Sequence, residues 1–341
     1  MNANLIDDFN ALSPEWQQWL CEALSARISQ AQISEILTEQ GHHAPQRLIE
    51  AAYQHPLCRW AIKQSVNAQQ RALFLRLHHE LWTSRQINIQ ILDAPSKEIF
   101  YTRCYDCSRP AIIRNWVNEW PSYSSSLWSP STWIERFANA EIEVVSGRNS
   151  HDAYDRCYLD LIDKCTLGEF AQWVLQNPMS NDRYLIARNR ALDEQSIAPI
   201  FDGISDEPYM KRSRRSGCVA LWFGPAQTVT PLHHDTCNIM FAQLRGKKSF
   251  ILVPPSNQDL FESSVNMYVD RDLDQDPVPE QIKVTVNQGE ALFIPIGWWH
   301  QVRSTEISVS VGMTHFEQVN RYPWFEPGRL VNHQLQNNDN H

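Results

Sequence analysis

The stretch Thr230-Pro231-Leu232-His233-His234-Asp235, together with Ile294-Pro295-Ile296-Gly297-Trp298-Trp299-His300, carries the side chains around which the chain is organised. In a strand, residues two apart point to the same side, so His233 and Asp235 would project together while His234 points away. An imidazole from His300 would complete a set of two nitrogens and one carboxylate. Such a set holds one face of a non-haem Fe(II) ion and leaves other coordination positions open.

A His-x-Asp pair alone is a weak signal, because it also fits a strand end with a solvated histidine. The flanking sequence strengthens the metal interpretation through three motifs: Trp222-Phe223-Gly224-Pro225, Ala242-Gln243-Leu244-Arg245-Gly246-Lys247-Lys248 and Val253-Pro254-Pro255. This pattern resembles the JmjC/cupin-like family of Fe(II)- and 2-oxoglutarate-dependent oxygenases, particularly its asparaginyl-hydroxylase-like members. The resemblance extends over residues 99–316 and is most specific over 222–300.

The resemblance implies a mainly β fold with flanking helices, a double-stranded β-helix or jelly roll. It implies Fe(II) held by His233, Asp235 and His300, with 2-oxoglutarate and O2 as co-substrates. The expected reaction hydroxylates a side chain of a protein or peptide while 2-oxoglutarate is decarboxylated to succinate. Demethylation of N-methyl-lysine and hydroxylation of a small molecule or a tRNA base stay open, because the ligand motif does not separate them.

The resemblance also places residues around 2-oxoglutarate. Lys248 falls where the family's co-substrate lysine lies and would bind the distal carboxylate, whereas the adjacent Lys247 would point into solvent. Thr230 and Tyr184 match positions whose hydroxyls bind the same carboxylate, with ordinary core or strand packing as the alternative. Asn238 corresponds to a co-substrate asparagine but lies one residue too close to the first ligand, so either a bulge re-aims it or the contact is lost.

Several other residues are candidates for the active-site mouth. Trp222 and Trp298 would line it while Trp299 alternates away, unless all three tryptophans are core packing. His234 and His315 could face the substrate. Gly312 stands where many relatives carry a polar asparagine or serine, which puts a second co-substrate contact in doubt.

Composition narrows the function classes. The 341 residues carry a net charge of -9, which disfavours generic nucleic-acid binding. The only strongly basic run, Lys211-Arg212-Ser213-Arg214-Arg215, fits a solvated loop better than a site for an acidic substrate. The first residues lack the pattern of a signal peptide and no stretch suggests a membrane span, so we expect a cytoplasmic protein. Eight cysteines, including a single Cys104-x-x-Cys107, are then expected to remain thiols without zinc.

Residues 1–88 read as a small helical domain, similar to the short UBA-like segments of bacterial cupin-like proteins. Ser13-Pro14-Glu15 is a strong helix start, and further helices are expected around 33–41, 44–53 and 67–85. Binding of a partner or of the substrate and structural capping are equally compatible with this domain.

Beyond residue 88 the apolar pattern changes to that of strands. The resemblance implies a short helix over 99–107 followed by a strand over 109–113. Further helices are expected over 128–137 and 166–176, and strands over 87–91, 140–147, 183–188, 219–222, 239–243, 249–253, 281–286, 291–294, 301–303 and 307–313. Residues 270–280 look like an acidic surface insertion. The catalytic domain would span 89–316, and the apolar extension 317–341 could form a homodimer.

A different class also fits part of this pattern: a metal-binding cupin without oxygenase activity, used for storage or sensing. Lys248 separates the two classes, because a cupin that does not use 2-oxoglutarate has no need of a buried cation there. A vestigial site on a partner-binding scaffold is disfavoured by the intact set of metal ligands.

Overall fold

The computed structural model describes residues 3–26, 28–83, 88–123, 126–186, 197–211, 217–264, 267–320 and 322. The chain divides into two compact units, Met1–Leu81 and Trp82–His341. The sequence had suggested a boundary at residue 88. Most of the basic run at 211–215 and most of the extension 317–341 lie outside the described residues, so the predicted dimerisation segment stays a prediction.

The first unit is helical, as the sequence predicted. Its helices are α1 (Ala3–Asn10), α2 (Pro14–Ser25), α3 (Gln30–Glu39), α4 (Pro45–Gln54) and α5 (Pro56–Thr83). Proline opens α2, and Ser29 and Gln32 form a capping box at α3. The buried side chains of Leu20, Ile33 and Leu37 contribute to one shared core, without which such short helices would be unstable. Helix α1 was not predicted from the sequence. The last helix was expected to begin at residue 67, but α5 begins at Pro56, because proline is well accepted at the first position of a helix.

One cysteine expectation is wrong in this unit. Cys21 of α2 and Cys58 of α5 form a disulfide, with their Cα atoms 5.3 Å apart. Packing of α2 beside the start of α5 brings the two side chains together, and their separation of 37 positions in the sequence gave no signal for this. Cys104 is a buried thiol and Cys107 an exposed one at a turn after a π-helix (Tyr101–Tyr105).

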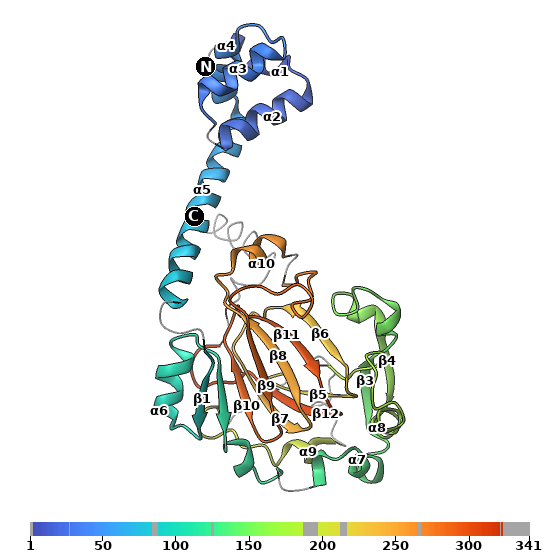
Figure 1. The fold of residues 1–341 in the computed structure, drawn as a ribbon. Helices are drawn as coiled ribbons and strands as arrows, with labels where there is room; N and C mark the ends of the chain where they lie inside the picture. Colours follow the sequence, from blue (N-terminus) through green and yellow to red (C-terminus); the bar gives the residue numbers. More distant parts are fainter. Residues whose placement is uncertain are drawn as a thin grey trace, which may run out of the picture. The chain divides into compact units, whose positions relative to one another are not determined.

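The second unit is a jelly roll of two sheets that face each other (Figure 1). The six-stranded sheet has the order β1 (Gln90–Asp93), β2 (Ala111–Arg114), β10 (Ala291–Ile294), β7 (Ile239–Arg245), β12 (Ser308–Met313), β5 (Val219–Gly224). The four-stranded sheet has the order β6 (Val229–His233), β11 (Trp299–Ser304), β8 (Lys248–Val253), β9 (Ile282–Val286). The predicted mainly β class is confirmed.

Three apolar layers hold this unit together. Between the sheets, Phe241, Phe250 and Leu292 belong to one core cluster. Outside the six-stranded sheet, the opposite side chains of the same strands pack on helices, namely α6 (Lys97–Phe100), α7 (Pro130–Arg136), α8 (Leu167–Gln176) and α9 (Ala198–Phe201). The hairpin β3 (Glu141–Val145) and β4 (Ile162–Thr166) leads into α8. Because β7 and β10 of the larger sheet are covered on both faces, they read as nearly continuous apolar runs.

The third layer shows how the acidic segment 270–280, most of which is exposed as the sequence predicted, is anchored to the sheet. Leu273 and Val278 are buried on the outer face of the four-stranded sheet, beside α10 (Gln258–Ser263). Asp272 and Asp274 both pair with Arg303 of β11. The acidic segment is therefore attached to the sheet by two buried apolar side chains and by ion pairs between its aspartates and Arg303. Among the described residues, none of the helices combines the length and apolar character needed to cross a membrane.

The turn between β7 and β8 requires a glycine. Gly246 has a φ of +68°, and a Cβ built on it would lie 2.3 Å from the carbonyl oxygen of Ile307. We therefore expect Gly246→Ala to lower the free energy of unfolding by more than the roughly 1–2 kcal/mol of a left-handed non-glycine residue. Chemical denaturation of the full chain would measure this.

Gly147→Ala is the matched control. Gly147 also has a positive φ, +74°, but an added Cβ would meet nothing within 4 Å. The difference between the two variants isolates the clash with Ile307, and equal destabilisation would contradict this account of the turn.

Candidate metal centre and its pocket

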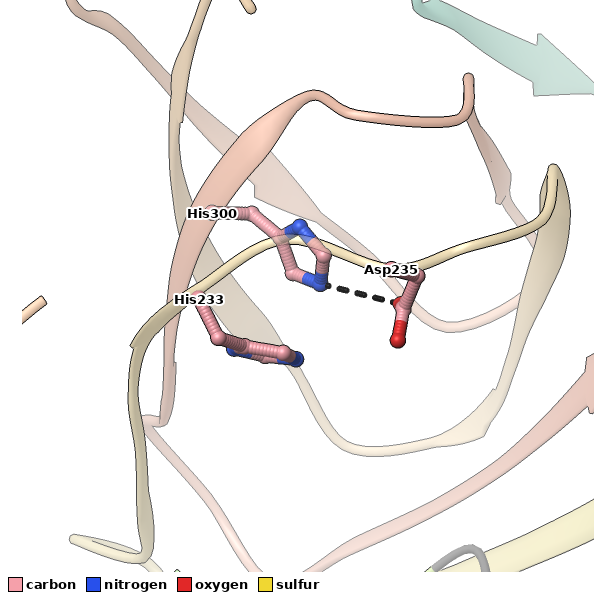
Figure 2. A group of neighbouring side chains, drawn as sticks. All are labelled: His233, Asp235 and His300. Carbon is pink, nitrogen blue, oxygen red and sulfur yellow. Dashed lines mark ion pairs between the residues drawn. The ribbon is translucent and has the colours of Figure 1, made fainter. Parts of the chain in front are cut away.

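Two facing histidines come from neighbouring strands. His233, the last residue of β6, lies directly opposite His300 of β11 in the strand register, and their ring centroids are 4.2 Å apart. Asp235 lies just beyond β6, where its carbonyl accepts a hydrogen bond from the amide of Gly297. Gly297 has a φ of +76°, so it allows the tight turn that returns the chain into β11. The three side chains converge as the sequence predicted (Figure 2).

Backbone carbonyls fix the orientation of both imidazoles. His233 Nδ1 lies 2.8 Å from the carbonyl oxygen of Pro231, and His300 Nδ1 lies 2.8 Å from that of Trp298. A carbonyl can only accept, so each Nδ1 carries the proton and each neutral ring keeps a lone pair on Nε2. Both Nε2 atoms are thereby available to a metal.

The donor set fits a metal ion. One ligand atom from each of the three residues lies within 4.8 Å of the others. His300 Nε2 and an Asp235 oxygen are 3.4 Å apart, so their lone pairs oppose each other unless a proton or a metal ion lies between them. Burial lowers the pKa of His233 to about 4. Burial also opposes ionisation of Asp235, but the interactions with His300, His233 and His234 outweigh it and hold that pKa at about 2. A neutral imidazole at His233 beside an ionised Asp235 matches the protonation states that a metal requires of its ligands.

These three residues open into a pocket of about 330 Å³ between the two sheets. Its walls include residues of both sheets and of two loops, 153–161 and 267–271. The lining residues that matter below are Asp155, Tyr158, Tyr184, Trp222, Thr230, Phe241, Lys248, Met267, Tyr268 and Gly312.

A buried amine lies in the pocket wall. Lys248 is 1% exposed, and its Nζ donates to the hydroxyl of Tyr184 at 2.7 Å. Burial lowers its pKa to about 7. Thr230 lines the same pocket from β6. Lys247 instead pairs with Glu306 at the surface, as the alternation along the strand predicts.

Trp222 also lines the pocket, and it does so in the space left by a glycine. A Cβ on Gly312 would lie 2.4 Å from the Trp222 ring. The indole therefore fills the space beside Gly312, the position at which the resemblance places a polar asparagine or serine in many relatives. A second co-substrate contact from this position is incompatible with the present placement of Trp222.

Four expectations about the pocket are not supported. The buried side chain of Asn238 is turned toward Asn320 and the amide of Ile296, so the one-residue shortening removes it from the pocket wall. Trp298 packs between the sheets and donates to the carbonyl of Ser108. His234 packs against Trp299, and His315 pairs with Asp206. None of the four is among the residues that line the pocket.

Sequence reasoning missed Asp155 and Arg148. Asp155 lines the pocket, and the fully buried Arg148 lies behind it, over the rings of Tyr154 and Tyr184. In the sequence, Asp155 is one of several acidic residues in an irregular segment, and such residues are usually solvated. Only the folded chain distinguishes it from Asp152 and Asp160, which are exposed.

Comparison with known proteins defines the class. Residues 96–321 match the family model of the cupin-like domain, which covers more than half of the chain, and the chain belongs to this family. The resemblance to JmjC/cupin-like proteins is thus confirmed.

Several curated proteins are similar to this chain. Jumonji C domain-containing protein 5 of Drosophila melanogaster is 28% identical over 66% of this chain and 59% of its own length. Lysine-specific demethylase JMJ30 of Arabidopsis thaliana is 30% identical over 63% of this chain and 52% of its own. The human bifunctional peptidase and (3S)-lysyl hydroxylase JMJD7 is 23% identical over 70% of this chain and 87% of its own. The chain therefore spans little more than half the length of the first two relatives.

The low pKa of Lys248 predicts how stability depends on pH. Between about 7 and the ordinary value of 10.5, the folded protein binds fewer protons than the unfolded chain, so the free energy of unfolding rises with pH across this window. At pH 6 the buried ammonium is destabilising. We expect Lys248→Met to exceed the wild type in stability there by on the order of a few kcal/mol, with the difference shrinking toward pH 10.

Denaturant titrations at a series of pH values would measure this difference. Lys247→Met, which removes an exposed amine, should show a constant small difference across the same range. A Lys248→Met difference that does not change with pH would contradict the buried-amine interpretation.

Proposed function

We propose that this protein is an Fe(II)- and 2-oxoglutarate-dependent oxygenase that hydroxylates a side chain of a protein or peptide. The single observation that carries the proposal is Lys248, a buried cation that shares a pocket with the three predicted metal ligands. A cupin that only stores or senses a metal does not require a buried lysine, whose burial destabilises the fold. A dicarboxylate co-substrate chelated at the metal would supply the anion that this lysine lacks.

The chain's own residues would perform binding and orientation. His233, Asp235 and His300 would hold Fe(II), with the two carbonyl-bound rings fixed in the ligating tautomer. Lys248 and the Tyr184 hydroxyl would bind the distal carboxylate of 2-oxoglutarate, and Thr230 would contribute its hydroxyl from β6. Trp222, Phe241 and Phe250 would exclude water from the co-substrate. The iron, once bound, would supply the oxidative chemistry that couples decarboxylation of 2-oxoglutarate to hydroxylation with O2.

Family membership supports the oxygenase class but does not distinguish hydroxylation from demethylation. The names of the relatives include both a lysyl hydroxylase and lysine demethylases, and both reactions can begin with oxidation of a C–H bond. The metal site serves either. Demethylation is therefore the alternative within this class, and a metal-binding cupin without oxygenase activity is the alternative outside it.

Formation of the co-substrate chelate is the first test. An anaerobic Fe(II) titration should produce a weak visible charge-transfer band only when 2-oxoglutarate is present. Lys248→Met should weaken 2-oxoglutarate binding by about 10- to 100-fold, as expected for loss of a charge-assisted hydrogen bond. Lys247→Met is the matched control and should bind as the wild type does. Iron binding without the band would favour the non-oxygenase cupin.

Removal of a metal ligand gives a second test. We expect His233→Ala and Asp235→Ala each to abolish succinate formation, because two remaining ligands bind Fe(II) too weakly. His234→Gln changes the histidine between them, which is turned toward Trp299, and should retain turnover. Full turnover in either ligand variant would rule out the proposed centre.

A further inference from the structure

We propose that Cys218, His315 and Asp206 form a reactive thiol site, at which hydrogen peroxide oxidises Cys218 to a sulfenic acid. This cluster takes no part in binding iron or 2-oxoglutarate as described above, so the inference goes beyond the proposed function and does not depend on it. Cys218 is a thiol of intermediate exposure and belongs to the wall of the metal pocket, whereas His315 and Asp206 are not among the residues that line it.

Pairing at the ends of two strands brings the three residues together. Cys218 directly precedes β5, and its carbonyl accepts a hydrogen bond from the amide of Thr314, which follows β12. The next residue is His315, whose carbonyl accepts from the amide of Lys211, so the segment from Asp206 to Lys211 lies alongside the end of β12. Asp206 and His315 are 109 positions apart, and the sequence gave no signal for their pairing.

Asp206 holds the imidazole in place and favours its charged form. His315 Nε2 lies 2.8 Å from Oδ1 of Asp206, and only 6% of the His315 side chain is exposed. Burial lowers the pKa of His315, but the interactions with Asp206 and Cys218 outweigh it and raise that pKa to about 9. The imidazole therefore carries a positive charge at neutral pH.

The second nitrogen of the imidazole is available to the thiol. Nδ1 of His315 is buried and makes no hydrogen bond of normal geometry in the described chain, while Nε2 is held by Asp206. A buried N–H without an acceptor is unfavourable, and the anionic sulfur of Cys218 would supply one. A positively charged histidine in turn stabilises the thiolate form of a neighbouring cysteine. A thiol, an imidazole and a group that orients the imidazole together make an activated nucleophile.

Two other thiols provide contrasts within the same chain. Cys104 is buried, and burial raises its pKa to about 12, so it stays protonated. Cys107 is exposed, but its Sγ donates to the carbonyl of Thr102 at 3.1 Å, which favours the neutral thiol. Exposure alone would make Cys107 more reactive than Cys218, whereas activation by the imidazolium would reverse this order.

The oxidation is a two-electron step. The thiolate sulfur attacks one oxygen of hydrogen peroxide, so that an S–O bond forms while the O–O bond breaks. The departing hydroxide takes the proton of the His315 imidazolium and leaves as water. The sulfur is oxidised by two electrons, the peroxide is reduced by the same two, and the imidazole is left neutral.

The test follows sulfenic acid formation at individual cysteines. Full-length protein is treated with stoichiometric hydrogen peroxide and the sulfenic-acid reagent dimedone, and a metal chelator prevents iron-catalysed oxidation. Peptide mass spectrometry then gives the rate of labelling at each cysteine. We expect Cys218 to be labelled at least about tenfold faster than Cys107 at pH 7, because an ordinary thiol is only a few per cent thiolate there. Labelling of the buried Cys104 should stay negligible while the protein is folded.

Two substitutions test the partners of the thiol. His315→Gln removes the imidazolium and should lower the rate at Cys218 by at least about tenfold. Asp206→Asn removes the charged acceptor of Nε2 and should lower it several-fold, since the imidazole is then less often protonated. His234→Gln changes a histidine outside the cluster and should label as the wild type does. Loss of the fold in any variant would be recognised by labelling of Cys104, which a purely structural role of the substituted residue would also produce.

Labelling of Cys218 no faster than that of Cys107 in the wild type would overturn the proposal, whether or not the variants fold. A fast rate at Cys218 that survives His315→Gln, with Cys104 still protected, would overturn it as well, because the reactivity would then not come from the imidazolium. A lower rate at Cys218 in both substitutions, again with Cys104 protected, would support the site.

Discussion

The register between β6 and β11 is the constraint on which the site depends. It sets His233 opposite His300, and a slip of one residue would turn one of the two imidazoles away from the other. The apolar layer of Leu232, Trp299 and Leu273 on the outer face of this sheet resists such a slip, because a slipped strand would bury polar groups there. The acidic segment that pairs with Arg303 adds a second restraint on β11. Parts of the chain outside the candidate site thus determine the geometry of the predicted metal ligands.

The pocket concentrates buried charge that folding alone would disfavour. Lys248, Arg148 and Asp155 are each largely removed from water; Asp155 faces Arg148 at 3.8 Å, whereas Lys248 makes no ion pair within the described chain. A buried charge destabilises the fold unless a counter-charge is supplied. A dicarboxylate beside Lys248 would supply that counter-charge. Stability is then lower in the empty protein, and ligand binding restores part of it.

Much of this architecture could be predicted from sequence because its signals are local. The spacing of His233 and Asp235, the capped helices and the apolar runs each depend on neighbouring residues. The structure confirms the mainly β class, and His233, Asp235 and His300 lie together in it. The failures involve long-range packing. The Cys21–Cys58 disulfide, the position of Trp298 between the sheets and the burial of Leu273 depend on segments distant in the chain. Asp155 could not be distinguished from its solvated neighbours, since composition does not reveal which carboxylate of a loop faces inward.

The contact between Gly312 and Trp222 links two positions that are 90 residues apart in sequence but paired through neighbouring strands. Any larger side chain at 312 collides with the indole, and a smaller side chain at 222 alone leaves a void beside Phe241. A series of single substitutions that places a polar side chain at position 312 of β12 therefore passes through a destabilised variant. This is avoided only when residues 222 and 312 change together. In evolutionary terms, positions 222 and 312 are epistatic, because the effect of a substitution at one depends on the residue at the other. Exchanging only one of the two residues between this chain and a relative would therefore not measure the contribution that the residue makes in its native protein.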